Sequence, residues 1–450
     1  MAEGIHVMLG EVADWIGATL QGDNQAFHGV STDSRSVQAG ELFVALRGPR
    51  HDGHDHVATA IAQGAAAVMV ERPMPVSVPQ LVVADSRRAL GELAAAWRRS
   101  LDVEVVAITG SNGKTTVKEM CAAILREAAP TLATEGNLNN DIGVPLTLLR
   151  LDETHRYAVV ELGANHPREI AELVKLVAPQ VALVTNAGPA HLEGFGSLEG
   201  VARAKGEIYS GLAEDGVAII NADDQFATLW HELAQGRRVI SFGAQADVSA
   251  TYQVDVNGQL LHWQGLDREC AFTLPLLGEH NLRNALAASA VALALELDTT
   301  LIAQGLQGMK PVPGRLHLRE GIGGARVIDD SYNANPASVS AGLKVLAGFT
   351  GKRYLALGDM GELGEGAEAL HREVGVEALQ LGIERLYAYG PLSRAACEGF
   401  GEQGRYFGEQ QQLIDALTPV LDNEVTVLVK GSRASRMDKV ADALSVARRD

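Results

Sequence analysis

Residues 103–120 read VEVVAITGSNGKTTVKEM, and this stretch decides the fold of the chain. A run of β-branched apolar residues leads into a loop with two glycines, Gly110 and Gly113, and apolar residues at helical spacing follow the loop. The order of strand, loop and helix is typical of a phosphate-binding loop. The spacing is shorter than G-x-x-x-x-G-K-[ST], because Ile108 stands where the first glycine would be.

The residue types of this loop suit a phosphate group. Glycines let backbone N–H groups close around phosphate oxygens, and the N-terminus of the helix adds a partial positive charge. Lys114 adds a full positive charge, and the hydroxyl of Thr115 can hold Mg²⁺. An ordinary glycine turn with an exposed lysine is the alternative. We expect a nucleoside triphosphate here, bound by Gly110, Asn112, Gly113, Lys114, Thr115 and Thr116.

Length and composition limit the classes of protein. A chain of 450 residues with 46% hydrophobic residues can build about three globular domains. The net charge of −18 argues against nucleic acid as a partner, since nucleic-acid binding needs a basic surface. The three cysteines are far apart and have no CxxC spacing, which indicates reduced thiols rather than disulfides or a zinc site.

The sequence shows neither an export signal nor an apolar run of about 18 residues that could cross a membrane. We therefore expect a cytoplasmic protein that does not insert into membranes. A monomer is the expected oligomeric state.

The pattern of strands and helices predicts an α/β fold with three domains. Residues 1–83 read as a small α/β domain, and the proline-rich residues 71–79 read as a boundary or a stiff connector. Strands and helices alternate over residues 84–313, which predicts a central P-loop ATPase domain with a parallel sheet. A hairpin-like pair and further β/α alternation over residues 314–450 predict a C-terminal Rossmann-like domain.

Two polar residues follow strands of the predicted central sheet. Glu161 lies near the end of the predicted strand 157–163, and His191 comes a few residues after the strand 181–185. Ligands of open parallel sheets collect at the carboxyl ends of the strands, so Glu161 and Thr115 are candidates to share Mg²⁺. His191 is a candidate metal or phosphate neighbour at the same rim. The alternatives are a surface glutamate and a structural histidine.

Lys205 is an anomaly on a predicted helix. The helix covers residues 198–212, and Lys205 falls on its apolar face with Val201, Ile208 and Leu212. A lysine in that position must extend its stem towards water, pair with an acid or be modified. Burial would lower its pKa and leave a nucleophilic amine.

Two further polar clusters suit a nucleotide or a sugar. Ser31–Arg35 is dense in hydroxyls, and the alternative for it is a hydrogen-bonded turn with a local ion pair. Asn281 and Asn284 share one face of a predicted helix, where their amides can both donate to and accept from an adenine edge. The alternative for this pair is an N-cap and a surface polar residue.

Taken together, these features predict a Mg²⁺-dependent user of a nucleoside triphosphate, with polar loops from the outer domains facing the P-loop. Phosphoryl transfer to water, to a hydroxyl or to a carboxylate would each fit. Composition and spacing do not choose among these reactions.

The motif set resembles the Mur ligases of bacterial cell-wall synthesis over essentially the whole chain, and the shortened phosphate loop is itself a trait of that family. Ser331–Pro336, Gly358–Gly364 and the absence of an Asp-Asn-Pro-Arg motif favour the member that adds a dipeptide. The motifs that carry the resemblance are Ser31–Arg35, Phe43–Gly48, Thr109–Thr116, Asn137–Pro145, Asn186–Glu193, His280–Asn284, Asp329–Pro336 and Gly358–Gly364.

The resemblance implies an ATP-driven ligation of D-alanyl-D-alanine to UDP-N-acetylmuramoyl-tripeptide through an acyl phosphate, which forms the pentapeptide precursor of peptidoglycan. It implies catalytic roles for Lys114, His191 and Lys205. It also implies that Thr115, Glu161, His191 and Lys205 arrange Mg²⁺, with two ions expected and Lys205 carbamylated.

The resemblance further assigns binding residues. Asn281 and Asn284 would meet adenine, and Arg315 and Asp330 would reach ATP from the third domain. The residues expected to contact the UDP-linked substrate and the dipeptide are, in chain order, Ser31, Thr32, Asp33, Ser34, Arg35 and Arg47 for the uridine diphosphate, Asn139 and Asn140 for the muramoyl part, and Asn333 and Asn335 for the dipeptide.

Other interpretations compete with this one. Another Mur-type ligase or a folylpolyglutamate synthetase would share the architecture and the acyl-phosphate chemistry. A binding protein whose domains close on ATP would bind nucleotide without turnover. A small-molecule kinase would release ADP without free phosphate.

Overall fold

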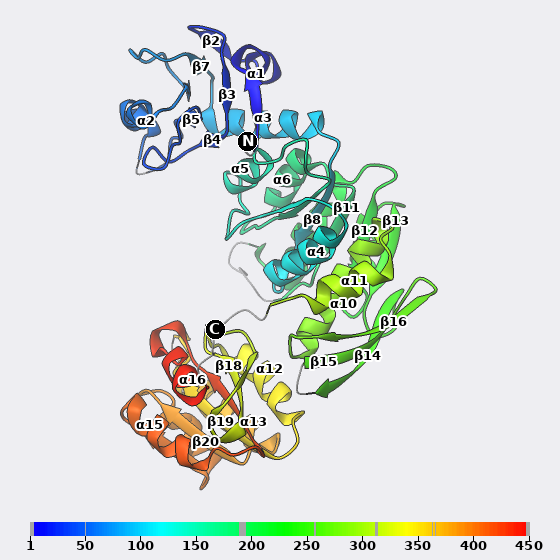
Figure 1. Cartoon of the computed structure of the whole chain (residues 1–450), viewed down its shortest axis with the longest axis vertical. Helices are drawn as coiled ribbons and strands as arrows, with labels where there is room; N and C mark the ends of the chain where they lie inside the picture. Colours follow the sequence, from blue (N-terminus) through cyan, green and yellow to red (C-terminus); the bar gives the residue numbers. More distant parts are fainter. Residues whose placement is uncertain are drawn as a thin grey trace. The chain divides into compact units, whose positions relative to one another are not determined.

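The computed structural model describes residues 4–49, 51–188, 195–255, 258–310, 314–361, 363–364 and 366–446. The chain divides into two compact units, which are described separately (Figure 1). One unit consists of Met1–Ala250, Trp263–Cys270 and Arg283–Gly305, and the other of Thr251–His262, Ala271–Leu282 and Leu306–Asp450.

The N-terminal part of the first unit is a small α/β arrangement. Its five-stranded sheet has the order β2-β7-β6-β5-β4, with β2 at Thr19–Gln21, β7 at Gln80–Val82, β6 at Ala67–Val70, β5 at Leu42–Val44 and β4 at Val30–Ser31. The helices are α1 (Leu9–Ile16), α2 (Val57–Gln63) and α3 (Ser86–Ser100), and β1 (His6–Met8) pairs with β3 (Ala26–His28). The proline-rich residues 71–79 connect β6 to β7 within this sheet, so their interpretation as a domain boundary is wrong.

A nine-stranded sheet forms the middle of the chain, with the order β16-β15-β14-β13-β12-β11-β8-β10-β9. Strands β8 and β11 pair in parallel and are almost wholly buried, as expected for a parallel sheet whose two faces are covered by helices. The first strands are β8 (Glu104–Thr109), β9 (Thr131–Ala133), β10 (Tyr157–Glu161), β11 (Val181–Val184), β12 (Val217–Asn221) and β13 (Arg238–Phe242). The helices are α4 (Lys114–Ala128), α5 (Gly143–Leu148), α6 (Glu169–Val177), α8 (Leu198–Gly206), α9 (Ala227–Leu233), α10 (Glu279–Ala294) and α11 (Thr299–Gln307).

The predicted alternation of strands and helices fails after β13. Three strands follow one another without a helix between them, namely β14 (Val248–Asp255), β15 (Gly258–Gly265) and β16 (Arg268–Leu274). Buried and exposed side chains alternate along much of β15, as in a strand with one covered face. Short connections leave no room for crossover helices, so these strands extend the sheet without continuing its β/α repeat.

The C-terminal part of the second unit holds a six-stranded sheet with the order β17-β18-β22-β19-β20-β21. Strand β17 (His317–Glu320) is antiparallel to β18 (Arg326–Asp330), and the others, β19 (Lys352–Gly358), β20 (Arg385–Tyr389), β21 (Gly404–Phe407) and β22 (Val425–Lys430), are parallel. Residues of α12 (Pro336–Ala347), α13 (Ala367–Gln380) and α14 (Arg394–Phe400) pack in one core, and residues of α15 (Gln410–Leu417) and α16 (Asp438–Leu444) in another.

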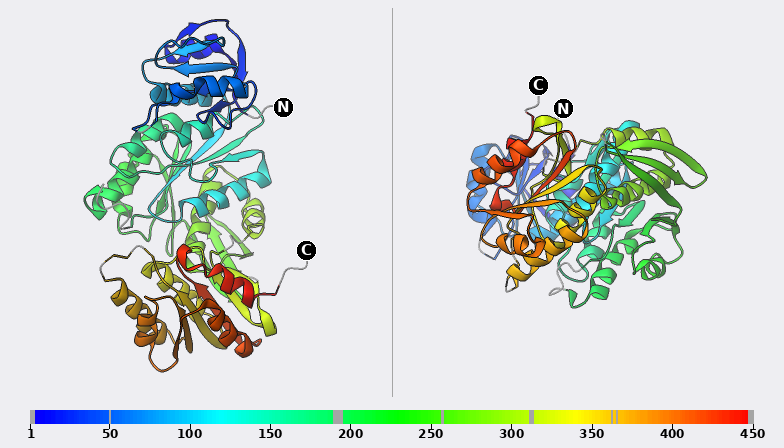
Figure 2. Two further views of the ribbon diagram at one scale, coloured as in Figure 1. Left: turned by 90° about the vertical axis from the view of Figure 1, so that its left-hand side faces the viewer. Right: turned by 90° about the horizontal axis from the view of Figure 1, so that it is seen from below.

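Alternation along the strands explains the two cores of this sheet. Ile328 and Leu428 belong to the core with α12–α14, whereas their neighbours Val327 and Val429 belong to the core with α15 and α16. Helices therefore lie on both faces of the sheet (Figure 2).

The predicted α/β class is confirmed. The predicted boundaries at residues 83 and 313 stay predictions. The three cysteines form no disulfide, and in the described ranges no helix is both long and apolar enough to cross a membrane.

Candidate active site

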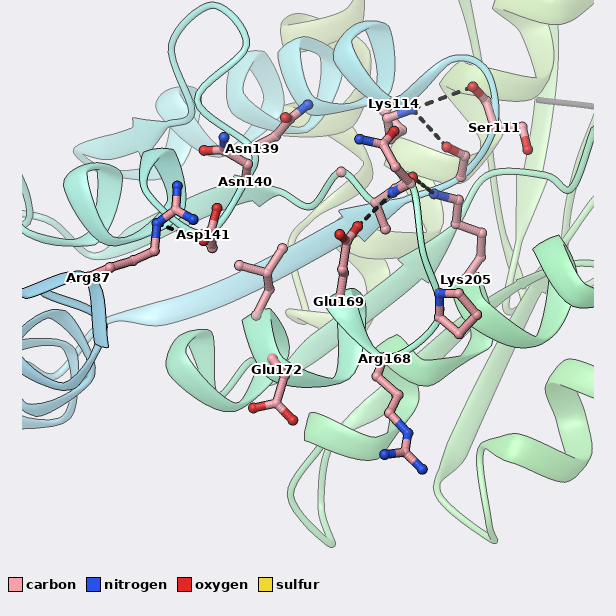
Figure 3. A pocket seen from close by; sticks show the side chains of 16 residues that line it. Arg87, Ser111, Lys114, Asn139, Asn140, Asp141, Arg168, Glu169, Glu172 and Lys205 are labelled. Carbon is pink, nitrogen blue, oxygen red and sulfur yellow. Dashed lines mark hydrogen bonds and ion pairs between the residues drawn. The ribbon is translucent and has the colours of Figure 1, made fainter. Parts of the chain in front are cut away.

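The predicted phosphate loop lies between the end of β8 and the start of α4. Gly110 and Gly113 have φ angles of 147° and 81°, which residues with a side chain rarely adopt. A Cβ atom added at Gly110 would lie 1.9 Å from Thr185 Oγ1, so the loop also needs glycine for space. Lys114 Nζ donates to the carbonyl oxygens of Gly110 at 2.7 Å and Ser111 at 3.4 Å (Figure 3). Burial lowers the pKa of Lys114, while the Glu161 carboxylate opposes that shift.

The segment that follows β11 forms hydrogen bonds with Asn112 of the phosphate loop. Thr185 Oγ1 donates to the Asn112 carbonyl at 2.7 Å. The Asn186 amide group also donates to that carbonyl and accepts from the Asn112 N–H, both at 3.0 Å. The sequence analysis missed Thr185 as a loop contact. Its position at the end of the strand beside β8 was the signal that could have identified it.

Glu161 lies at the end of β10 and is 2% exposed. Its Oε2 accepts from the Thr115 hydroxyl at 3.0 Å, and its Oε1 accepts from the Asn139 amide at 2.8 Å. A carboxylate and a hydroxyl that converge in this way are oxygen ligands of the kind Mg²⁺ prefers. Within the described ranges no three His, Cys, Asp or Glu side chains gather as a metal cage.

Lys205 lies on α8, which ends at Gly206 and is followed by a 3₁₀ turn over Glu207–Gly211. The predicted helix is therefore shorter than 198–212, but Lys205 is 3% exposed, so the interpretation that its stem extends to water is wrong. Nζ lies 3.4 Å from the Ala164 carbonyl, to which it donates, and 5.5 Å from the centre of the Phe195 ring. Burial and the charge of Lys114 lower the pKa of Lys205 to about 8.

A pocket of about 670 Å³ lies between the phosphate loop and Lys205. Lys114 and Lys205 line it on one side, and Asn139, Asn140 and Asp141 line it on another (Figure 3). The Asn140 carboxamide oxygen accepts from the N–H of Gly143, the first residue of α5, at 2.8 Å. Five predicted residues line this pocket, namely Gly110, Lys114, Asn139, Asn140 and Lys205. Thr115 and Glu161 do not line it, and they are connected to it through the hydrogen bond from Asn139 to Glu161. The predicted ligand His191 lies outside the described residues.

Asn281 and Asn284, which were predicted to bind adenine, have different surroundings. A Cβ atom added at Gly113 would lie 2.7 Å from Asn284 Oδ1, so Asn284 packs directly against the phosphate loop. The Asn281 amide donates to the Leu277 carbonyl at 2.8 Å. Contact of either residue with adenine stays a prediction.

The Ser31–Arg35 cluster forms the compact turn that was its alternative interpretation. Arg35 Nε and Nη2 donate to the two Asp33 carboxylate oxygens at 2.9 and 2.7 Å. These bonds lower the pKa of Asp33 to about 2. Asp33 N–H also donates to Ser31 Oγ at 3.2 Å, Thr32 is partly exposed and Ser34 is buried. These contacts lie within the cluster itself, and its substrate role stays a prediction.

Arg47 is held near two acids, 3.5 Å from Glu71 and 4.0 Å from Asp52. Its side chain remains 64% exposed, so the guanidinium is accessible to a ligand.

In the second unit, Asp330 and Lys430 form a short ion pair of 2.5 Å between the ends of adjacent strands. Burial raises the pKa of Asp330, and the Lys430 ammonium opposes that shift. Arg315 lies 4.8 Å from the centre of the Tyr332 ring. The sequence analysis assigned no role to Lys430, which is the last residue of β22 as Asp330 is of β18.

The two asparagines predicted for the dipeptide have local roles. The Asn335 side chain caps α12 by accepting from the Ser338 N–H at 2.8 Å. The Asn333 side chain accepts from the N–H of Ala334 at 2.9 Å. Neither contact tests whether they bind a dipeptide.

Known proteins match this chain over nearly its whole length. The family models match at residues 26–98 (Mur ligase family, catalytic domain), 108–292 (Mur ligase middle domain) and 314–433 (Mur ligase, glutamate ligase domain). The UDP-N-acetylmuramoyl-tripeptide–D-alanyl-D-alanine ligase of Escherichia coli is 46% identical, with 98% of each chain covered. The protein of the same name from Bacillus subtilis is 35% identical, over 96% of this chain and 97% of that one.

Solved structures agree with these matches. A crystal structure of MurF from Acinetobacter baumannii has a TM-score of 0.86 and 38% identity, over 98% of this chain and 99% of that one. MurF ligase from Thermotoga maritima in complex with ADP has a TM-score of 0.78 and 29% identity, over 92% and 96%. A Mycobacterium tuberculosis folylpolyglutamate synthase is only 20% identical at a TM-score of 0.62, over 80% and 95%, so it shares the fold alone.

Proposed function

The chain belongs to the Mur ligase family, and from this premise we propose that it joins D-alanyl-D-alanine to UDP-N-acetylmuramoyl-tripeptide at the expense of ATP. It is an ATP-dependent ligase that forms an amide bond and serves peptidoglycan synthesis. The proposed substrates rest on one observation, the 46% identity over 98% of both chains with the UDP-N-acetylmuramoyl-tripeptide–D-alanyl-D-alanine ligase of Escherichia coli.

The chemistry balances in two steps. A carboxylate oxygen of the tripeptide attacks the γ-phosphorus, the bond to the β-phosphate oxygen breaks, and ADP leaves. The amine of D-alanyl-D-alanine then attacks the carbonyl carbon of the acyl phosphate, loses a proton, and inorganic phosphate leaves from the tetrahedral intermediate. Lys114, whose ammonium donates to the Gly110 carbonyl of the phosphate loop, would stabilise the negative charge that develops on the phosphoryl oxygens.

Thr115 and Glu161 would hold Mg²⁺, with Asn139 fixing the orientation of the carboxylate. The bound ion would neutralise phosphate charge and orient the triphosphate. His191 completes this proposed ligand set.

We further infer that Lys205 is carbamylated. Its amine is buried and its pKa is lowered to about 8, which favours the neutral form that reacts with carbon dioxide. Attack of the amine nitrogen on the carbon of CO₂ with loss of a proton gives a carbamate. This replaces a buried cation beside Lys114 with an anion, which removes their repulsion and supplies oxygens for a second Mg²⁺.

The remaining binding roles follow the same proposal. ATP is contacted by Asn281, Asn284, Arg315 and Asp330, and the uridine diphosphate by Arg47 and Ser31–Arg35. The muramoyl part is contacted by Asn139 and Asn140, and the dipeptide by Asn333 and Asn335. The three domains have boundaries at residues 83 and 313, and the chain acts in the cytoplasm as a monomer.

The acceptor requirement tests the proposed reaction. Phosphate release from MgATP and UDP-N-acetylmuramoyl-tripeptide is measured with D-alanyl-D-alanine, with single amino acids and with no acceptor. We expect phosphate release and a heavier nucleotide product with the dipeptide alone. Turnover with a single amino acid on a shorter muramoyl precursor would move the enzyme to an earlier ligation, and nucleotide binding without turnover for every pair would contradict a ligase.

A further inference from the structure

Arg87 lines the pocket on the side away from the two lysines and has no role in the reaction described above. It lies in the first turn of α3, and Figure 3 shows it beside Asp141, across the hollow from Lys114 and Lys205. Arg87 Nε lies 3.2 Å from Asp141 Oδ2, and the two side chains are 51% and 54% exposed. Ion pairs this exposed contribute little free energy, so a ligand can replace the Asp141 carboxylate at small cost.

The backbone at Arg87 is firmly fixed although its side chain is accessible. The Asp85 carboxylate accepts from the N–H groups of Arg87 and Arg88 at 2.9 and 3.0 Å, and so caps α3. The Ser86 hydroxyl lies 2.8 Å from the Ala45 carbonyl and 3.1 Å from Glu71 Oε1. The guanidinium therefore starts from a rigid position at the pocket wall.

The same contacts connect Arg87 to the residue proposed to bind the uridine diphosphate. Glu71 holds Ser86 through Oε1 and lies 3.5 Å from Arg47 through Oε2. Arg47 is thus connected to Arg87 through two residues, Glu71 and Ser86, and Ser86 is the neighbour of Arg87 in the chain.

The charge of the pocket differs from that of the chain. The whole chain has a net charge of −18, yet the pocket is lined by four basic residues, Arg87, Lys114, Arg168 and Lys205, and by three acids. On the proposed function the UDP-linked substrate carries a diphosphate and free carboxylates. The guanidinium is a planar fork of donors that binds either group through two parallel hydrogen bonds.

We propose that Arg87 binds an anionic group of the UDP-linked substrate, and that Asp141 holds the guanidinium until this group displaces it. This inference rests on the proposed function for the identity of the ligand. It predicts that the two partners of one ion pair have opposite effects on the affinity for the substrate. Arg87 attracts the substrate anion, whereas Asp141 competes with that anion for the guanidinium.

The affinity for UDP-N-acetylmuramoyl-tripeptide, measured by calorimetry without ATP or dipeptide, tests this assignment. We expect Arg87→Gln to raise Kd about 20-fold, as for loss of a charge-assisted bidentate contact. Asp141→Asn is expected to lower Kd by about threefold, the scale of an exposed ion pair. Arg88→Gln is the matched control with unchanged Kd, because Arg88 is 79% exposed and pairs with Glu92.

A parallel titration with UDP identifies the anion. A raised Kd for UDP in Arg87→Gln assigns the diphosphate, whereas a change confined to the tripeptide substrate assigns a carboxylate. Equal losses of affinity in Arg87→Gln and Asp141→Asn would mean that the pair is only structural, and an unchanged Kd in Arg87→Gln would also overturn the proposal. Failure of the proposed function is separable, since the wild-type chain would then bind no UDP-N-acetylmuramoyl-tripeptide.

Discussion

Replacing Lys114 with Met is expected to lower kcat by about 10³-fold, the upper range for removing one group that stabilises transition-state charge. Met keeps most of the unbranched side chain and removes the ammonium that donates to carbonyls of the phosphate loop. The hydrogen bonds of Nζ to the Gly110 and Ser111 carbonyls hold that charge at the phosphate loop, where we propose that the phosphoryl oxygens bind. Phosphate release in the presence of all three substrates measures the effect.

Lys175→Met is the control for Lys114→Met. Lys175 is 65% exposed and pairs with Glu172 on the helix surface, so its loss should leave kcat near the wild-type value. The role assigned to Lys114 would be wrong if Lys114→Met kept more than about a tenth of the wild-type kcat while binding ATP normally, because such a loss is smaller than one charge-stabilising group provides.

Replacing Lys205 with Ala is expected to lower activity by about 10²-fold or more, with partial recovery when short carboxylic acids such as formate or acetate are added. The added acid supplies the carboxylate that the carbamate provides in the intact protein. The buried position of Lys205 leaves a cavity of suitable size once its side chain is removed. Activity as a function of acid concentration measures the recovery.

A spectroscopic signal separates carbamylation from a packing role. The wild-type protein equilibrated with ¹³C-bicarbonate should show a carbamate carbon resonance that Lys205→Ala lacks. Because the neutral amine reacts with CO₂ and the pKa of Lys205 is about 8, the rate of labelling at constant CO₂ should rise as the pH increases towards 8. Full activity in Lys205→Ala, or no carbamate signal in the wild type, would contradict the assignment.

The sequence was most informative where the chemistry is local. The phosphate loop could be predicted because strand, glycines, lysine and helix lie within residues 103–120, and their spacing alone sets their geometry. Lys205 was identified by its position on an apolar helix face, which left open whether its stem extends to water, and the structure shows that it is buried. Glu161 followed from the rule that ligands collect at the carboxyl ends of parallel strands.

The contacts that the sequence did not predict join residues far apart in the chain. Thr185 braces Asn112, 73 residues away, and Lys430 pairs with Asp330, 100 residues away. Such pairs depend on which strands become neighbours in the sheet, and residue spacing does not encode this. Strands β14–β16 depart from the predicted alternation for a related reason, because strands connected without helices do not show the spacing of a β/α repeat.

The transfer of oxygen from substrate to phosphate tests ligation through an acyl phosphate most directly. UDP-N-acetylmuramoyl-tripeptide is labelled with ¹⁸O in the carboxylate that reacts, and the phosphate released with MgATP and D-alanyl-D-alanine is analysed by mass spectrometry. We predict one labelled oxygen in each phosphate and the other in the new amide carbonyl, because the attacking carboxylate oxygen leaves with phosphorus. Unlabelled phosphate, with both labelled oxygens still in the carboxylate, would contradict the ligase mechanism and indicate that water receives the phosphoryl group.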